Sequence, residues 1–408
     1  MQYAPQQREE TRRTFQLEAG ALTLTAPTVA RDELYLIAER INPKRAFLFV
    51  STILGRHIPV HPAEHRAVLQ ELAIGVSTHL LEGPVFVMGF AETAVGIGAG
   101  VFDCMRMAQC DRVMGYLTTT RFSPSGVEDW FKIEESHSHA VEHIILHPDA
   151  DVVQNGPNAT LVLVDDETTT GKTFAQLARG LQAHGLTFGR VILVTLTDWS
   201  NGCAAQAVQG IFGDAEIRCV SLQQGVWNWT PKKDWVHPGL PKNCTANCPP
   251  WTPDRSQRLM APRTGISAST PRQSGEDIMT MIEAAGFAPV DKSDRVLVVG
   301  AGEHVWQPML AAEALSLRGH DTRFITTTRS PILQGETIRH KFSFPDHYGQ
   351  GFWMYMHNVV PSEWNRILLF TETGIDGVPL KLVNWLGRVD VVDGSGTVTA
   401  FSGGRCVA

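Results

Sequence analysis

Residues 161–173 read Leu-Val-Leu-Val-Asp-Asp-Glu-Thr-Thr-Thr-Gly-Lys-Thr, and this stretch decides the fold that we expect. Its first four residues are all apolar, which is typical of a short buried strand inside a parallel sheet. Residues 174–181 then carry apolar side chains at helical spacing. A strand that passes through a short loop into a helix predicts an α/β fold with a parallel sheet and helices on both faces. In such folds ligands bind where the strands end, so the loop is also the first place to look for a site.

The loop has the composition of a phosphate site. The first turn of a helix has unpaired N–H groups and a partial positive charge, and a glycine lets the backbone approach an anion closely. The donors that we expect to bind phosphate are Thr168, Thr169, Thr170, Gly171, Lys172 and Thr173. Asp165 and Asp166 would repel phosphate, so they should face another part of the ligand, and ribose hydroxyls suit them because a carboxylate only accepts hydrogen bonds.

The same residues resemble the phosphoribosyl-pyrophosphate (PRPP) signature of type I phosphoribosyltransferases. This resemblance implies a Rossmann-like domain. Glu167 and Thr168 stand where apolar residues are common in that family, and Lys172 is also unusual, which bears on substrate preference. The alternative is a P-loop NTPase, because residues 171–173 match the end of a Walker A loop. Asp166 stands where that loop needs a glycine, so the NTPase reading is less favoured.

The resemblance extends to other segments of the first half. The loop after the expected strand at 46–50 would bind pyrophosphate through Ser51, Thr52, Gly55 and Arg56. Residues 134–143 would form a mobile hood in which His137 and His139 contact pyrophosphate or the acceptor. Glu92 and Arg121 follow two further strands and are candidates to contact the acceptor or complete the pyrophosphate site.

Two patterns resemble metal sites but are not favoured as such. His139-x-x-Glu142-His143 has the spacing of an inverted zincin motif, which would place both histidines on one helical face. Cys244 and Cys248 lie near His237, but a fourth zinc ligand is not evident, and we favour free thiols.

Composition limits the classes of function. The 408 residues predict two or three domains, and a formal charge of −7 argues against nucleic acid as a main partner. No apolar run reaches the length of a membrane span, and the polar N-terminus lacks the core of a signal peptide, so we expect a cytoplasmic protein. The seven scattered cysteines favour reduced thiols.

The second half repeats landmarks of the first. Residues 296–303 parallel 85–92, residues 324–331 parallel 116–124, and residues 367–370 parallel 161–164. We therefore hypothesise a duplicated Rossmann-like unit whose second copy has no PRPP loop. The strand ends of this second copy give further candidates for an acceptor or second site, namely Gly300, Gly302, Glu303, Thr327, Arg329 and Ser330.

The tetrapeptide Thr-Arg-Ser-Pro at 328–331 adds a second resemblance, which covers most of the chain. The sequence resembles a bacterial two-domain family in which an orotate-type phosphoribosyltransferase domain precedes a TRSP domain. That family is associated with tellurium-resistance and stress gene neighbourhoods, which implies the biosynthesis of a nucleoside-like metabolite. The boundaries that we predict are a disordered N-terminus at 1–16, the transferase domain at 17–226, an irregular arm at 227–287 and a TRSP α/β domain at 288–408.

The expected reaction is the displacement of pyrophosphate at ribose C1 of PRPP by a small nucleobase-like acceptor. Asp165 and Asp166 would hold the ribose hydroxyls, directly or around Mg²⁺, while positioning and electrostatics supply the catalysis. A non-catalytic protein that senses PRPP or a nucleotide is the alternative from another class. The sequence leaves a homodimer open.

Overall fold

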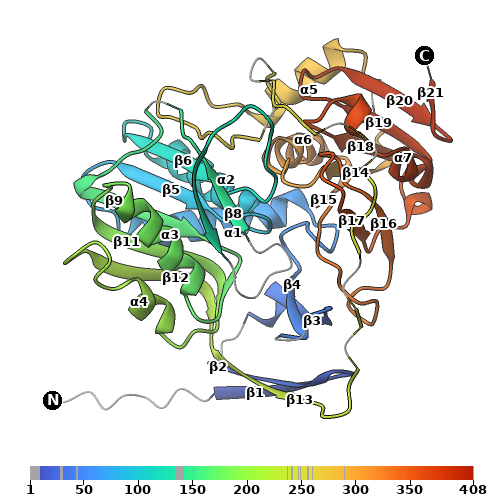
Figure 1. The fold of residues 1–408 in the computed structure, drawn as a ribbon. Helices are drawn as coiled ribbons and strands as arrows, with labels where there is room; N and C mark the ends of the chain where they lie inside the picture. The colour runs from blue at the N-terminus through green and yellow to red at the C-terminus, as the bar shows by residue number, and fades with distance from the viewer. Residues whose placement is uncertain are drawn as a thin grey trace.

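The protein consists of two α/β domains that lie side by side in the computed structural model (Figure 1). The structure describes residues 10–407 except 28–30, 43–44, 135–141, 150, 237, 240–241, 247, 249, 255–256, 260 and 289. Among these residues, no helix is both long and apolar enough to cross a membrane.

The first domain is built on a parallel sheet, as the sequence predicts. The strand order is β6-β5-β9-β11-β12, and the short β10 continues along β11 beyond the end of β9. The strands are β5 (Val85–Gly89), β6 (Met114–Thr118), β9 (Gly156–Val164), β10 (Glu167–Thr168), β11 (Phe188–Asp198) and β12 (Glu216–Gln224). Helices α1 (Pro62–Ser77) and α2 (Val95–Ala108) pack together, as do α3 (Lys172–Ala183) and α4 (Cys203–Val208).

The second domain has a sheet of order β15-β14-β18-β19, all parallel, extended by the antiparallel strands β20 and β21. Its strands are β14 (Arg295–Gly300), β15 (Asp321–Thr326), β18 (Arg366–Phe370), β19 (Arg388–Val392), β20 (Val398–Ser402) and β21 (Arg405–Val407). The helices are α5 (Gly275–Ala284), α6 (Trp306–Leu317) and α7 (Leu380–Leu386), with short 3₁₀ turns η2 (Pro361–Glu363) and η3 (Ile375–Gly377). A hairpin of β16 (Lys341–Pro345) and β17 (Trp353–His357) lies beside this sheet.

The two parallel sheets share one strand order. When the parallel strands of each sheet, leaving out the short β10, are numbered by their order in the sequence, both sheets have the spatial order second, first, third, fourth. The strands that occupy equivalent places are β5 and β14, β6 and β15, and β9 and β18, which are the segments that the sequence comparison paired. Different strand orders in the two halves would have contradicted the duplication. The orders are the same, so the duplication stays a hypothesis that is consistent with the fold.

Smaller sheets complete the first domain. β1 (Glu10–Leu17), β2 (Gly20–Pro27) and β13 (Val226–Pro231) form a three-stranded antiparallel sheet at the lower edge of Figure 1. Above it, η1 (Asp32–Leu34) leads into the hairpin of β3 (Tyr35–Glu39) and β4 (Phe47–Ser51). A second hairpin joins β7 (Asp129–Glu134) to β8 (Glu142–Leu146).

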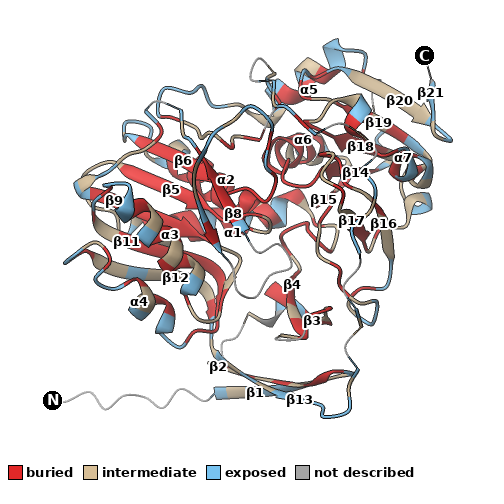
Figure 2. Cartoon of the chain, in the orientation of Figure 1, coloured by how far each residue is buried: buried red, intermediate tan, exposed pale blue. Residues whose placement is uncertain are grey.

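The core follows the central strands of both sheets. Every side chain of β5 is buried, as are the last six of β9, because helices or other segments cover both faces of a parallel sheet (Figure 2). Residues 161–164 are thus the fully buried last part of β9, whose end lies at the edge of the first sheet.

Two expectations about local structure need correction. The N-terminus is not disordered from Glu10 onward, because β1 pairs with β2 along its whole length; residues 1–9 lie outside the described part. The arm at 227–287 is not wholly irregular, since most of β13 and all of α5 lie within it. Glu142 and His143 belong to strand β8 and not to a helix, which agrees with discounting the zincin spacing; His139 lies outside the described residues.

Candidate active site

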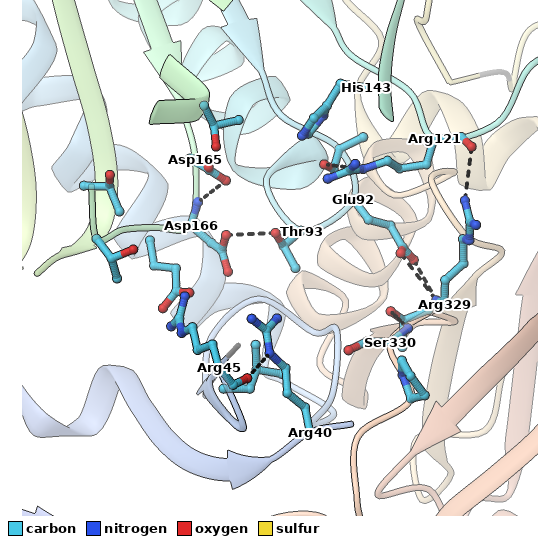
Figure 3. Close-up of a pocket in the computed structure, with 18 of the residues that line it drawn as sticks. Arg40, Arg45, Glu92, Thr93, Arg121, His143, Asp165, Asp166, Arg329 and Ser330 are labelled. Atoms are coloured by element: carbon cyan, nitrogen blue, oxygen red, sulfur yellow. Dashed lines mark hydrogen bonds and ion pairs between the residues drawn. The ribbon is translucent and has the colours of Figure 1, made fainter. Parts of the chain in front are cut away.

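A cavity of about 460 Å³ lies at the carboxyl edge of the first sheet, between the two domains. One wall consists of Asp165 and the residues that follow it as far as Phe174. The β3–β4 hairpin and β13 supply a second wall, lined by Arg40, Arg45, Leu48 and Trp227. The second domain supplies a third, lined by Thr328, Arg329, Ser330, Pro331, Phe352, Trp353 and Tyr355. Figure 3 shows side chains from all three walls around one space.

The acidic pair is held in place directly after β9. The Asp166 N–H donates to Asp165 Oδ1 over 2.9 Å, and Thr93 Oγ1 donates to Asp166 Oδ1 over 2.8 Å (Figure 3). Burial raises the pKa of Asp166, while the hydrogen bond from Thr93 opposes that rise. Two carboxylates therefore face the cavity with part of their acceptor capacity already directed by the protein.

The loop after the acidic pair opens helix α3 toward the cavity. Gly171 has φ of 70°, in the left-handed region that favours glycine, and it precedes the first helical residue, Lys172. The Gly171 N–H donates to Thr168 Oγ1 over 3.2 Å, which tightens the turn. The N-cap residue, Gly171, has no side chain to cap the helix, and Thr170 Oγ1 accepts from the Lys172 N–H over 3.4 Å. All six predicted phosphate donors line the cavity, so the structure brings them together with Asp165 and Asp166.

Glu167, the residue that departs from the usual signature, has a partner in the hairpin wall. Arg45 Nη2 lies 2.7 Å from Glu167 Oε1, and the Arg45 guanidinium lies 4.7 Å from the ring centre of Phe47. Burial raises the pKa of Glu167, although Arg45 opposes the rise. The unusual acid thus ties the loop to the β3–β4 hairpin.

The end of the cavity beyond β5 and β6 contains Glu92, Arg121 and His143. Arg121 Nη1 donates to the carbonyl of Glu142 over 3.0 Å, and its Nε donates to that of Ala91 over 3.3 Å. Thr119 Oγ1 accepts from the Ala91 N–H over 2.9 Å and lies 2.9 Å from His143 Nδ1. The hood histidines His137 and His139 lie outside the described residues, whereas His143 is placed here by β8.

The predicted pyrophosphate loop has a different place. Ser51, Thr52, Gly55 and Arg56 are all described, and none of them lines the cavity. Buried Arg56 Nη1 donates to the carbonyls of Gly302 and Thr327, each over 2.8 Å, and lies 3.3 Å from Glu92 Oε1. These contacts join the two domains, so the geometry gives this loop a structural role.

The second-site candidates divide into two groups. Arg329 and Ser330 line the cavity, whereas Gly300, Gly302, Glu303 and Thr327 do not. Glu303 accepts from the Arg121 N–H over 2.7 Å and from Thr120 Oγ1 over 2.5 Å, so it too joins the domains.

The carboxyl end of the second sheet is filled by the chain's own arm. Arg263 lies 2.5 Å from Glu372 and 3.3 Å from Glu303, and its guanidinium lies 4.9 Å from the ring centre of Trp251. All four side chains are buried. Cys244 and Cys248, also in the arm, are free thiols, and the described residues contain no group of three or more side chains suited to hold a metal. His237 lies outside the described part.

Several cavity residues were not foreseen from the sequence. Thr93 lies 73 residues from its partner Asp166, and Arg45 is 122 positions before Glu167 (167 − 45). Phe352 and Tyr355 come from the second domain. Only Thr93 had a signal, because it follows the strand end that already gave Glu92.

Comparison with known proteins agrees with this geometry. Residues 34–226 match the family model described as phosphoribosyl transferase, and residues 261–386 match the model described as the TRSP domain C-terminal to it. No curated protein matches the sequence.

Solved structures with similarity to the first half include three phosphoribosyltransferases. The adenine phosphoribosyltransferase of Rhodothermus marinus is 15% identical with a TM-score of 0.33, and the match covers 47% of this chain and 94% of that one. The orotate phosphoribosyltransferase of Aeropyrum pernix is 17% identical with a TM-score of 0.29, covering 47% and 88%. The Trypanosoma brucei adenine enzyme, in complex with AMP, pyrophosphate and ribose 5-phosphate, is 12% identical with a TM-score of 0.32, covering 46% and 76%.

The two family models meet at the cavity, since one contains the acidic pair and the threonine loop and the other contains Arg329 and Ser330. Residues 34–226 are therefore a phosphoribosyltransferase domain, an enzyme domain of the pentosyltransferase class, and residues 261–386 are its C-terminal TRSP domain.

Proposed function

We propose that the cavity binds PRPP and transfers its phosphoribosyl group to a small nitrogenous, nucleobase-like acceptor. One observation carries the proposal: two carboxylates and the N-terminus of helix α3, which suit a ribose diol and a phosphate respectively, line the same cavity. The 5′-phosphate would lie on residues 168–173, and the ribose hydroxyls on Asp165 and Asp166.

The chain's own groups account for binding and orientation. Thr93 holds the Asp166 carboxylate toward the cavity, so this carboxylate need not reorganise when the diol arrives. Displacement at ribose C1 develops positive charge on the sugar, which ionised Asp165 and Asp166 would stabilise. The two domains enclose the cavity and would limit the access of water to the reacting carbon.

The donor set fits an assisting Mg²⁺. Asp165 and Asp166 offer the hard oxygen ligands that the ion prefers, and the described residues provide no complete cage. This is the pattern expected where substrate oxygens and water complete the coordination. Such an ion would neutralise the charge of the departing pyrophosphate.

Calorimetry of PRPP with Mg²⁺ tests the proposal. We expect wild-type protein to bind and an Asp165→Asn/Asp166→Asn variant to lose binding, because each amide lacks the negative charge and keeps only one of the two acceptor oxygens. An Asp111→Asn/Asp214→Asn variant, which removes two exposed carboxylates outside the cavity, should bind as wild type does.

Turnover is measured as pyrophosphate release in the presence of a panel of nitrogenous bases. Release that requires both PRPP and one of the bases identifies the acceptor. The proposal is wrong if wild type does not bind PRPP, or if the double aspartate variant binds it equally well.

A further inference from the structure

The same kind of hydrogen bond is formed twice between the two domains, once in each direction. Glu92 follows β5, and its carboxylate accepts from the Arg329 N–H over 3.2 and 3.3 Å (Figure 3). Glu303 follows β14, the equivalent strand, and accepts from the Arg121 N–H over 2.7 Å. Arg121 and Arg329 in turn follow the equivalent strands β6 and β15. Each domain therefore offers a glutamate to the backbone of the other domain's arginine.

The hydrogen bonds around these two contacts are also repeated. Thr119 Oγ1 accepts from the Ala91 N–H over 2.9 Å, and Thr327 Oγ1 accepts from the Gly302 N–H over 2.7 Å. Thr119 and Thr327 each precede their arginine by two positions. Reciprocal contacts of this kind are the mark of an isologous interface, in which one surface meets a second copy of itself. Here the two matching surfaces belong to the two domains of one chain.

The two ends of this interface differ in one respect. The end of the second sheet is filled by Arg263, which pairs there with Glu372. Among the residues that the structure describes, none fills the end of the first sheet in this way, and the cavity lies there. The contacts between the domains therefore place Arg329 at an open cavity, whereas the corresponding end of the second sheet is filled by Arg263.

Arg329 is a cation for which the described residues provide no carboxylate partner. Its guanidinium lies 3.7 Å from the ring centre of Phe352, and Nη1 donates to the Arg121 carbonyl over 3.2 Å. Within the described part of the chain it forms no ion pair, unlike Arg56 and Arg263. Burial lowers its pKa, while nearby Glu92 opposes this effect. An anionic ligand in the cavity would supply the opposite charge that a partly desolvated guanidinium lacks.

The order of the strands indicates which anion this is. Across the edge of the sheet, α3 and β9 present the phosphate loop and the acidic pair, and β5 and then β6 follow. With the 5′-phosphate on α3 and the ribose on Asp165 and Asp166, the group on ribose C1 extends toward the ends of β5 and β6. Arg121 and Arg329 line the cavity there.

We infer that the second domain completes the active site by supplying Arg329 to bind the pyrophosphate group of PRPP, in the manner of a partner subunit within one chain. The inference rests on the proposed function and deepens it. Arg329 would act on the leaving group, while residues 165–173 bind the ribose 5-phosphate part.

The test compares PRPP with ribose 5-phosphate, which lacks the pyrophosphate group. Calorimetry with both ligands is carried out on the full chain, as wild type, Arg329→Gln and Arg388→Gln. Arg388 is an exposed cation of β19 outside the cavity and is the matched control. We expect Arg329→Gln to weaken PRPP about tenfold or more, as for the loss of a charge-assisted hydrogen bond, and to leave ribose 5-phosphate unchanged.

Arg329→Lys keeps the charge but loses the planar fork, so it should lose part of the PRPP affinity and none of that for ribose 5-phosphate. This variant decides the matter if Arg329→Gln does not fold. The inference is overturned if the Arg329 variants bind both ligands as wild type does, or weaken both equally. If wild type binds neither ligand, the proposed function fails and the inference fails with it. If wild type binds both ligands, the proposed binding of PRPP stands, and the Arg329 variants alone decide whether Arg329 binds the pyrophosphate group.

Discussion

Gly171 shows how a single residue fixes the shape of the phosphate loop. Its φ of 70° is strained for any residue with a side chain, and an added Cβ would overlap the Cα of Ala204 at the start of α4. A backbone atom in a packed helix has little room to move aside. The loop and helix α4 are therefore matched in shape at this residue.

We expect Gly171→Ala to lower the free energy of unfolding by about 2 kcal/mol or more, the sum of a strained backbone and a steric overlap. Gly185→Ala is the matched control, because Gly185 has φ of 79° but open space around its Cβ position. The control should cost about 1 kcal/mol. Urea unfolding of both variants measures the difference; equal losses would show that the overlap with Ala204 is relieved.

At the residue scale, the sequence predicts the contiguous part of the site and misses the rest. Asp165, Asp166 and the threonine loop were predicted to lie together because they are neighbours in the sequence. Arg45 and Phe352 were missed because only the folded chain brings them to the cavity. The contacts of Arg56 with Gly302 and Thr327 in the second domain were also not predicted, because no local pattern reveals them.

At the scale of elements, the β16–β17 hairpin contains a buried histidine opposite a lysine. His357 pairs with Lys341 across the hairpin and has no exposed surface. Burial, assisted by the charge of Lys341, lowers the pKa of His357 to about 3. In the unfolded chain a histidine has a pKa of about 6.5. Between these two pKa values only the unfolded state binds the proton. His357 therefore does not lower the free energy of unfolding above about pH 6.5, and it lowers it progressively as the pH drops below that value.

We expect His357→Phe to reduce this acid sensitivity. The wild-type free energy of unfolding should lose about 1.4 kcal/mol per pH unit below pH 6 from this residue alone, and the variant should lack that share of the slope. Tyr355→Phe, in the same strand, is the control and should keep the wild-type slope. Urea unfolding at pH 7.0, 6.0 and 5.0 provides the comparison, and identical slopes for wild type and His357→Phe would contradict the assignment.

Elements were predicted best where a pattern is regular. The strand at 161–164 and the helix at 174–181 lie within β9 and α3. Strand β8, which contains His143, was not predicted from the sequence, because pairing with β7 decides its conformation and pairing is not local.

At the scale of the whole molecule, Arg263 joins the arm to the second domain. Burial alone would raise the pKa of Glu372, but Arg263 outweighs it, so the net pKa is lowered and the carboxylate stays ionised. Removing the arginine leaves Glu372 buried without its cation.

Arg263→Gln should therefore lower the free energy of unfolding by about 3–5 kcal/mol, the usual cost of breaking a buried ion pair. Arg258→Gln, at an exposed position of the same arm, should cost less than about 0.5 kcal/mol. Adding Glu372→Gln to Arg263→Gln should recover part of the loss, because a neutral amide is cheaper to bury than a charge. Urea unfolding compares the three variants, and a loss for Arg263→Gln as small as that of Arg258→Gln would refute the argument.

The sequence predicted two α/β units and their repeated landmarks, but not that they meet at their carboxyl ends. Composition made the arm look like a linker, whereas Arg263 and Trp251 fill the end of the second sheet. Such long-range packing depends on shape and burial, which a single sequence does not display. The homodimer stays a prediction.

The reciprocal glutamate–arginine contacts have a consequence for how the enzyme tolerates dilution. In an enzyme whose site is completed by a second subunit, the fraction of complete sites falls when the subunits dissociate. Here Glu92 and Arg329 belong to one chain, so the effective concentration of the completing arginine is set by the connecting arm and not by the amount of protein. The contact between the domains therefore survives at any dilution at which the chain stays folded.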